Sequence, residues 1–122
     1  MPIKNREQFF ASQWTLDELS ECLGGRRGFT DVDALTERHG KFLLLEFKHP
    51  NAMKVPTGQH ILLKNITQVG NGDITAIVVW GEPDKPIAAQ IYKDGECGNR
   101  FHITKDALHN LIKRWDAWAD AH

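Results

Sequence analysis

The chain has 122 residues, of which 41% are hydrophobic and 25% charged, and its formal net charge is −1 at pH 7. This composition excludes a disordered chain, and the length allows one domain, residues 1–122, to bury its own core. The net charge gives no global basic field that would indicate a polyanionic partner.

No targeting or membrane segment is expected. The N-terminal stretch MPIKNREQFF lacks a long apolar segment, and no run of residues approaches membrane-spanning length. Cys22 and Cys97 lie far apart and form no CxxC pair, which fits reduced thiols. We therefore expect a cytoplasmic protein without a membrane partner, located in the host cell cytoplasm if a phage encodes it.

Two helices are expected before the first strand. Residues 4–13 fit a helix that places the acid Glu7 on a face with apolar residues at helical spacing. Thr15 and Glu18 have the spacing of a capping box, which predicts a second short helix that ends at Gly24-Gly25.

A β-hairpin is expected next, followed by a third helix. Its strands cover residues 29–37 and 41–48, around a turn at His39-Gly40. Thr57 can cap a helix from about Gly58 to Thr67. The apolar residues expected on its inner side are Ile61, Leu62, Ile66 and Val69.

The last third of the chain predicts two strands, DITAIVVW and IAAQIYK, joined by the loop GEPDKP. Residues 94–103 fit a short, less regular hairpin, and 104–119 form the clearest amphipathic helix, in which Trp115 and Trp118 belong to the core-facing stripe rather than to a base-stacking surface. The order α-α-β-β-α-β-β-α predicts an α/β fold (α+β in some schemes) with a mixed sheet flanked by helices.

The hairpin carries the most informative residues. A two-residue turn places Asp33 opposite Glu46 and Asp31 opposite Lys48. Facing carboxylates destabilise a strand pair, whereas Mg²⁺ is held by one or two carboxylates, so the pair predicts a metal site. Lys48 would orient or deprotonate a water, or neutralise charge on phosphorus, which suits hydrolysis of a phosphodiester.

The tripeptide Glu46-Phe47-Lys48 is weak evidence alone, because an E-x-K arises often by chance. A solvated salt bridge between Asp31 and Lys48 is the structural alternative. A slip of one residue would also move Asp33 to the other face of the sheet.

Asp33, followed by Glu46-Phe47-Lys48 at the end of the next strand, resembles the PD-(D/E)xK nuclease superfamily, most closely its small Holliday-junction-resolvase and VRR-Nuc branches. The likeness covers about residues 5–80, although Val32 stands where these nucleases usually have a proline. It implies a restriction-endonuclease-like fold and a metal-dependent endodeoxyribonuclease that acts on DNA, including branched or structured DNA.

Carried over residue by residue, this resemblance implies that Asp33 and Glu46 bind Mg²⁺, for which Mn²⁺ would substitute. The carbonyl of Phe47 would be a third ligand, and Asp31 is the second choice for the ligand at Asp33. Lys48 would be the catalytic lysine.

Two helix residues complete the implied catalytic set, Glu7 and Gln59. From the residues alone, Glu7 could instead stabilise the start of a helix. Gln59 could hold a water or a phosphate oxygen, or be a half-buried residue bonded to backbone.

Arg26, Arg27, Lys54 and Lys64 are the expected contacts to nucleic acid, although adjacent arginines often belong to a solvated loop. The six histidines show no zinc-binding spacing. The alternative function is a non-cleaving DNA-binding, phage accessory or protein-interaction module on the same fold. The sequence does not fix the oligomeric state, but duplex and four-way-junction cutters of this type are often dimers, so a homodimer is one expectation.

Overall fold

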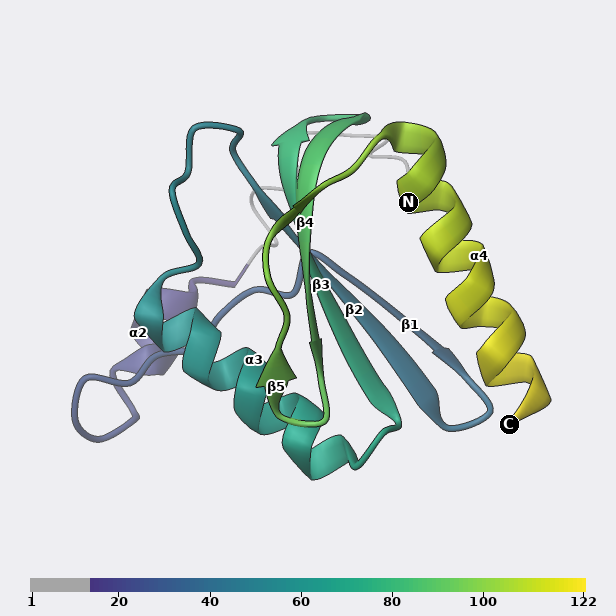
Figure 1. Cartoon of the computed structure of the whole chain (residues 1–122). Coiled ribbons are helices and arrows are strands. Elements are labelled where there is room, and N and C mark those ends of the chain that lie inside the picture. The colour runs from purple at the N-terminus through teal and green to yellow at the C-terminus, as the bar shows by residue number, and fades with distance from the viewer. Residues whose placement is uncertain (1–13) are drawn as a thin grey trace. The chain divides into compact units, whose positions relative to one another are not determined.

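The computed structural model describes residues 14–122, which fall into two parts, 14–31 and 32–122 (Figure 1). In the first part, helix α2 (Leu16–Ser20) follows Thr15, whose side chain makes no capping hydrogen bond. The expected capping box is therefore wrong. The Ser20 hydroxyl instead accepts a hydrogen bond of 2.8 Å from the Phe29 amide. The helix expected over residues 4–13 lies outside the described residues.

The second part is built on a six-stranded mixed sheet. Its long strands are β1 (Ala34–Arg38), β2 (Lys41–Lys48), β3 (Ile74–Glu82) and β4 (Lys85–Lys93). Strands β2 and β3 are parallel, and the β1–β2 and β3–β4 pairs are antiparallel. The mixed α/β architecture is thus as expected.

Two short strands change the expected element order. They are β5 (Glu96–Cys97) and β6 (Phe101–His102). The expected hairpin over residues 94–103 is wrong, because β5 and β6 each pair with β4 rather than with each other. The expected loop GEPDKP is also shorter than predicted, since β3 and β4 leave only residues 83–84 between them.

The β1–β2 hairpin has the expected turn and register. His39 and Gly40 have φ angles of 51° and 81°, as a two-residue hairpin turn requires. Leu35 pairs with Leu44, which is the register that a two-residue turn at His39-Gly40 predicts. However, β1 begins at Ala34 instead of residue 29, because a side-chain oxygen of Asp33 accepts the hydrogen bond of the Phe47 amide (2.8 Å) in place of a backbone carbonyl.

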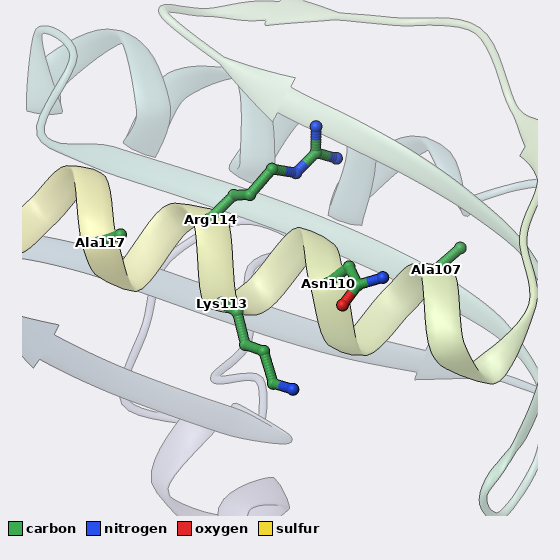
Figure 2. A pocket seen from close by; sticks show the side chains of 5 residues that line it. All are labelled: Ala107, Asn110, Lys113, Arg114 and Ala117. Carbon is green, nitrogen blue, oxygen red and sulfur yellow. The ribbon is translucent and has the colours of Figure 1, made fainter.

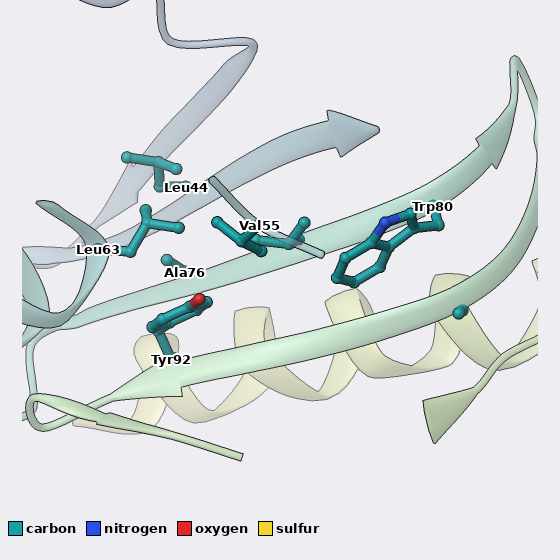
Figure 3. Packing of buried hydrophobic residues seen from close by; sticks show 8 residues of the cluster. Leu44, Val55, Leu63, Ala76, Trp80 and Tyr92 are labelled. Carbon is teal, nitrogen blue, oxygen red and sulfur yellow. The ribbon is translucent and has the colours of Figure 1, made fainter. Parts of the chain in front are cut away.

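Helices α3 (Thr57–Gly70) and α4 (Lys105–Ala121) contribute to two separate clusters of buried residues. Leu63 of α3 packs in a cluster drawn in Figure 3, whose other buried members are Leu44, Val55, Ala76, Val78, Trp80, Ala88 and Tyr92. Leu108 of α4 packs in the other, with Leu43, Ile77, Val79, Ala89 and Ile103. Because side chains alternate along a strand, the two clusters lie on opposite faces of the sheet.

The inner side of α3 differs from the prediction. Ile61, Leu62 and Val69 are exposed, and Leu63 and Thr67 are the buried residues. The Thr67 hydroxyl donates to the Leu63 carbonyl (2.8 Å) and accepts from the Gly95 amide (3.1 Å). This polar contact between the helix and the β4–β5 turn fixes the rotation of α3, and it cannot be read from hydrophobic spacing.

The ends of the helices are partly as expected. Thr57 is the first residue of α3, and Pro56 occupies the N-cap without a side-chain hydrogen bond, so capping by Thr57 is wrong. Helix α4 is capped by Thr104, whose hydroxyl accepts from the Ala107 amide at 3.2 Å. Trp115 packs against the core as predicted.

One ion-pair cluster ties the hairpin to α4. The Arg38 guanidinium lies 2.6 Å from Asp116 and 2.8 Å from Asp120. These contacts join the end of β1 to the last turns of α4. Within residues 14–122, no helix has the length and apolar character needed to cross a membrane.

Candidate active site

Glu46 is a buried carboxylate near the end of β2. Its relative exposure is 7%, and it lies among apolar strand residues. Strand alternation places its side chain on the same face as Leu44, the face that α3 packs against. Burying a carboxylate costs free energy unless it is paired or hydrogen-bonded, so its neighbours define what this position can do.

Asp33 is the first of these neighbours. Its carboxylate accepts the 2.8 Å hydrogen bond from the Phe47 amide, at the point where the β1–β2 ladder ends. This bond holds Asp33 beside β2 although Asp33 itself precedes β1. The structure therefore brings the two predicted acids together, through a side-chain contact rather than through a strand pair.

The environment disfavours the charged form of Glu46. Burial raises the pKa of the Glu46 carboxyl, and the negative charge of Asp33 raises it further. A backbone hydrogen bond from Asp33 and the positive charge of Lys48 lower it, but the net direction is upward. Two carboxylates thus share a site in which a further positive charge would be stabilising.

Gln59 reaches this site from the first turn of α3. Its side-chain amide nitrogen donates to a Glu46 carboxylate oxygen at 3.0 Å. Its amide oxygen is buried and has no hydrogen-bond partner among the described residues. An unpaired buried acceptor of this kind is suited to a water or a metal-bound group. The sequence-based placement of Gln59 beside Glu46 is confirmed.

Lys48 is half-buried and lies two residues beyond Glu46 on the same face of β2. Its charge acts on Glu46, as the pKa of that carboxyl reflects. Phe47, between them, points to the opposite face and is 53% exposed. The end of β2 therefore carries an acid and a base on one face and an aromatic ring on the other.

No family model matches this chain, and comparisons with curated proteins and with solved structures give no match either. The likeness to PD-(D/E)xK nucleases thus remains a prediction from the sequence.

The donor set fits one hard divalent cation. Asp33 and Glu46 offer carboxylate oxygens, and the Phe47 carbonyl is adjacent in the chain. Within residues 14–122 no group of three or more His, Cys, Asp or Glu side chains is arranged to hold a metal. Mg²⁺ needs only one or two carboxylates, because it keeps several waters and binds phosphate oxygens, so this site suits Mg²⁺ better than zinc.

Four sequence-predicted residues precede the part of the chain, residues 32–122, that holds this site. Glu7 lies outside the described residues. Asp31, Arg26 and Arg27 belong to the first part, 14–31, where Arg27 donates to the Gly24 carbonyl at 3.0 Å.

Two predicted basic contacts lie in the second part. Lys54, in the loop between β2 and α3, is exposed, and so is Lys64 on α3. Their exposure leaves both side chains free to meet a phosphate, and their contact with nucleic acid remains a prediction.

Arg100 is a supporting residue that the sequence did not indicate. Its guanidinium stacks 4.2 Å from the centre of the buried Trp80 ring. It also donates to the carbonyls of Ala52 (3.4 Å) and Met53 (3.1 Å). These contacts hold the loop that leads from Lys48 to α3. A single arginine in an irregular segment gives no sequence signal for such a role.

His60 and Tyr92 form a second polar contact beneath α3. The His60 ring nitrogen lies 2.6 Å from the Tyr92 hydroxyl, and burial raises the pKa of Tyr92, with Cys97 adding to the effect. Since His60 follows Gln59, this contact anchors the helix turn that holds Gln59 against Glu46.

Proposed function

We propose that this chain is a Mg²⁺-dependent nuclease that hydrolyses phosphodiester bonds of nucleic acid, with DNA as the expected substrate. The proposal is carried by one observation, the approach of Asp33 to the buried carboxylate of Glu46. That approach raises the pKa of Glu46, and a bound cation would relieve the repulsion. The likeness of these residues to the PD-(D/E)xK pattern supports the same reading.

Each residue has a role that follows from its position. Asp33, Glu46 and the Phe47 carbonyl would hold Mg²⁺. When bound, this ion would supply electrostatic stabilisation of the charge that develops on the phosphate and would lower the pKa of the attacking water. Gln59 orients the Glu46 carboxylate through its 3.0 Å hydrogen bond.

Lys48 supplies a positive side-chain charge at this site, in addition to that of the bound cation. It lies on the face of β2 that carries Glu46, where an ammonium group can bind a phosphate oxygen or orient a water. Its compact charge and three donors suit both tasks.

The test is nicking of supercoiled plasmid DNA in Mg²⁺ and in EDTA. The wild type should nick only with the divalent ion, and Glu46→Gln and Lys48→Ala should each lose activity about 100-fold or more. Lys41→Ala, at the other end of β2, is the matched control and should keep its activity. Nicking that persists in both site variants would contradict the proposal.

A second candidate is a non-cleaving nucleic-acid-binding module on the same fold. It is favoured by the small donor set, since only two carboxylates meet within the described residues. Calorimetric titration with Mg²⁺ and Mn²⁺ separates the two functions. DNA binding that weakens with salt but occurs without any metal binding would favour the module.

A further inference from the structure

A cavity of about 580 Å³ lies at the end of β2. Its walls come from residues at the end of β2, from the β3–β4 turn and from the first turns of α4. Because β2 and β3 are parallel, their carboxyl ends meet here, which is where open α/β sheets bind ligands.

The bend of the β3–β4 hairpin shapes this cavity. The ladder shifts register between Trp80 and Gly81, and Gly81 has a φ of 153°. A side chain at Gly81 would collide with the Lys85 carbonyl oxygen, so only glycine lets the two strands approach so closely. The bend carries Pro83 and Asp84 to the rim of the cavity.

The lining combines an apolar floor with a charged rim. Leu45, Val79, Leu108 and Ile112 supply aliphatic surface, and the half-exposed ring of Phe47 supplies an aromatic one. The rim carries hydrogen-bond donors and acceptors, including both basic and acidic groups. They belong to His49, Lys105, His109, Glu82 and Asp84. Such a site suits a flat ring with polar edges, whereas a fatty chain would leave the rim groups without partners.

We propose that this cavity binds a nucleobase of the strand whose phosphate lies at Asp33, Glu46 and Lys48. This inference rests on the proposed function, because that function supplies the nucleic acid strand whose base would enter the cavity. Glu46 and Phe47 are consecutive and point to opposite faces of β2, and Lys48 also lines the cavity, so the phosphate site and the cavity adjoin at the end of one strand. A nucleotide bound there with its base out of the stack would place that base against the ring of Phe47.

The volume agrees with this ligand. Small-molecule sites usually measure about 300–1,000 Å³, and the cavity falls within that range. A second hollow, along α4, has a similar volume of about 590 Å³ but no aromatic ring for a base to stack on. Its lining is made of Ala107, Asn110, Lys113, Arg114 and Ala117 (Figure 2).

The probe is adenosine, which has a base but no phosphate, titrated without metal and followed by amide shifts in NMR spectra. Saturable shifts should appear at Gly81 and Ile112, and a short single-stranded oligonucleotide should displace the nucleoside. Phe47→Ala should weaken binding about fivefold or more, the range expected for loss of one stacking ring. Phe42→Ala removes a partly exposed ring from the other face of β2 and should leave binding unchanged.

The proposal is overturned if adenosine gives no saturable shift at millimolar concentration, if the shifts centre on the α4 hollow, or if both phenylalanine variants weaken binding equally. It is also overturned if the oligonucleotide fails to displace adenosine. Glu46→Gln separates this result from the proposed function, because that variant should lose cleavage and still bind adenosine. Cleavage by the wild type without adenosine binding would refute the base site and leave the nuclease standing.

Discussion

The side-chain amide of Gln59 donates a hydrogen bond of 3.0 Å to the carboxylate of Glu46. This bond joins the first turn of α3 to the end of β2, across the loop that Arg100 holds in place. It is the contact that compensates most directly for burying a charged group beside a second acid.

Gln59→Met should therefore destabilise the metal-free protein. It removes the donor while keeping the side-chain volume, and hydrogen bonds to charged groups contribute about 1.5–3 kcal/mol. Urea unfolding of this variant, of Glu46→Leu and of the double variant forms a double-mutant cycle. Strict additivity of the two single-variant changes in unfolding free energy would show that the bond contributes nothing.

Glu46→Gln should change how stability depends on pH. The folded pKa of Glu46 is raised above its unfolded value of about 4.3. Its contribution is therefore complete below about pH 4.3 and is lost as the pH rises through the folded pKa. In EDTA, the variant should gain stability relative to the wild type, by up to about 1 kcal/mol, as the pH rises to neutrality.

The measurement is urea unfolding of both proteins from acid to neutral pH, and the difference between them removes the effect of other titrating groups. Mg²⁺ should then raise the Tm of the wild type and leave the variant almost unchanged. A difference that stays constant over this range would contradict the raised pKa.

Two substitutions of Asp33 separate its structural role from its charge. Asp33→Ala leaves the Phe47 amide without its partner and should cost about 1–2 kcal/mol of stability. Asp33→Asn retains an oxygen that can accept this bond, so it should be close to the wild type in stability. Calorimetry should show that both variants lose Mg²⁺ binding, and retained binding in Asp33→Asn would exclude Asp33 as a charged ligand.

Tyr92→Phe should lower the stability of the protein at neutral pH. It should also reduce the stability that is lost at alkaline pH. The variant loses the contact with His60, at a cost of about 1 kcal/mol. In the wild type the raised pKa of Tyr92 keeps the hydroxyl neutral, so its contribution is complete below the unfolded value of about 10 and is lost above it. Denaturant midpoints between about pH 8 and 11 should fall less steeply in the variant.

Gly81→Ala should be among the most damaging small substitutions in the sheet. The added carbon would meet the Lys85 carbonyl, and the φ of 153° disfavours other residues, so a loss of more than about 2 kcal/mol is expected. Gly58→Ala is the control, since its position in the first turn of α3 is open, and it should stabilise by up to about 1 kcal/mol. Equal effects in thermal unfolding would contradict this account of the bend.

The β1–β2 hairpin could be predicted because the residues that determine its turn and register are close together in the sequence. Two residues with positive φ at His39-Gly40 fix the register, and the hydrogen bond from the Phe47 amide to the Asp33 carboxylate then holds Asp33 beside β2. The rotation of α3 could not be predicted, because a hydrogen bond from Gly95 to Thr67, far apart in sequence, outweighs the apolar stripe of Ile61 and Val69. The predicted start of β1 is wrong for a similar reason. The Asp33 side chain accepts the hydrogen bond of the Phe47 amide, and the β1–β2 strand pairing ends there.

The position of β2 between a local hairpin and a parallel pairing has a kinetic consequence. The β1–β2 hairpin closes over a short turn, whereas pairing with β3 requires the chain to pass through the whole of α3. Short loops close faster than long ones. We therefore expect the two acids to meet during refolding before Gln59 arrives, so that the repulsion between them raises the early barrier rather than the late one.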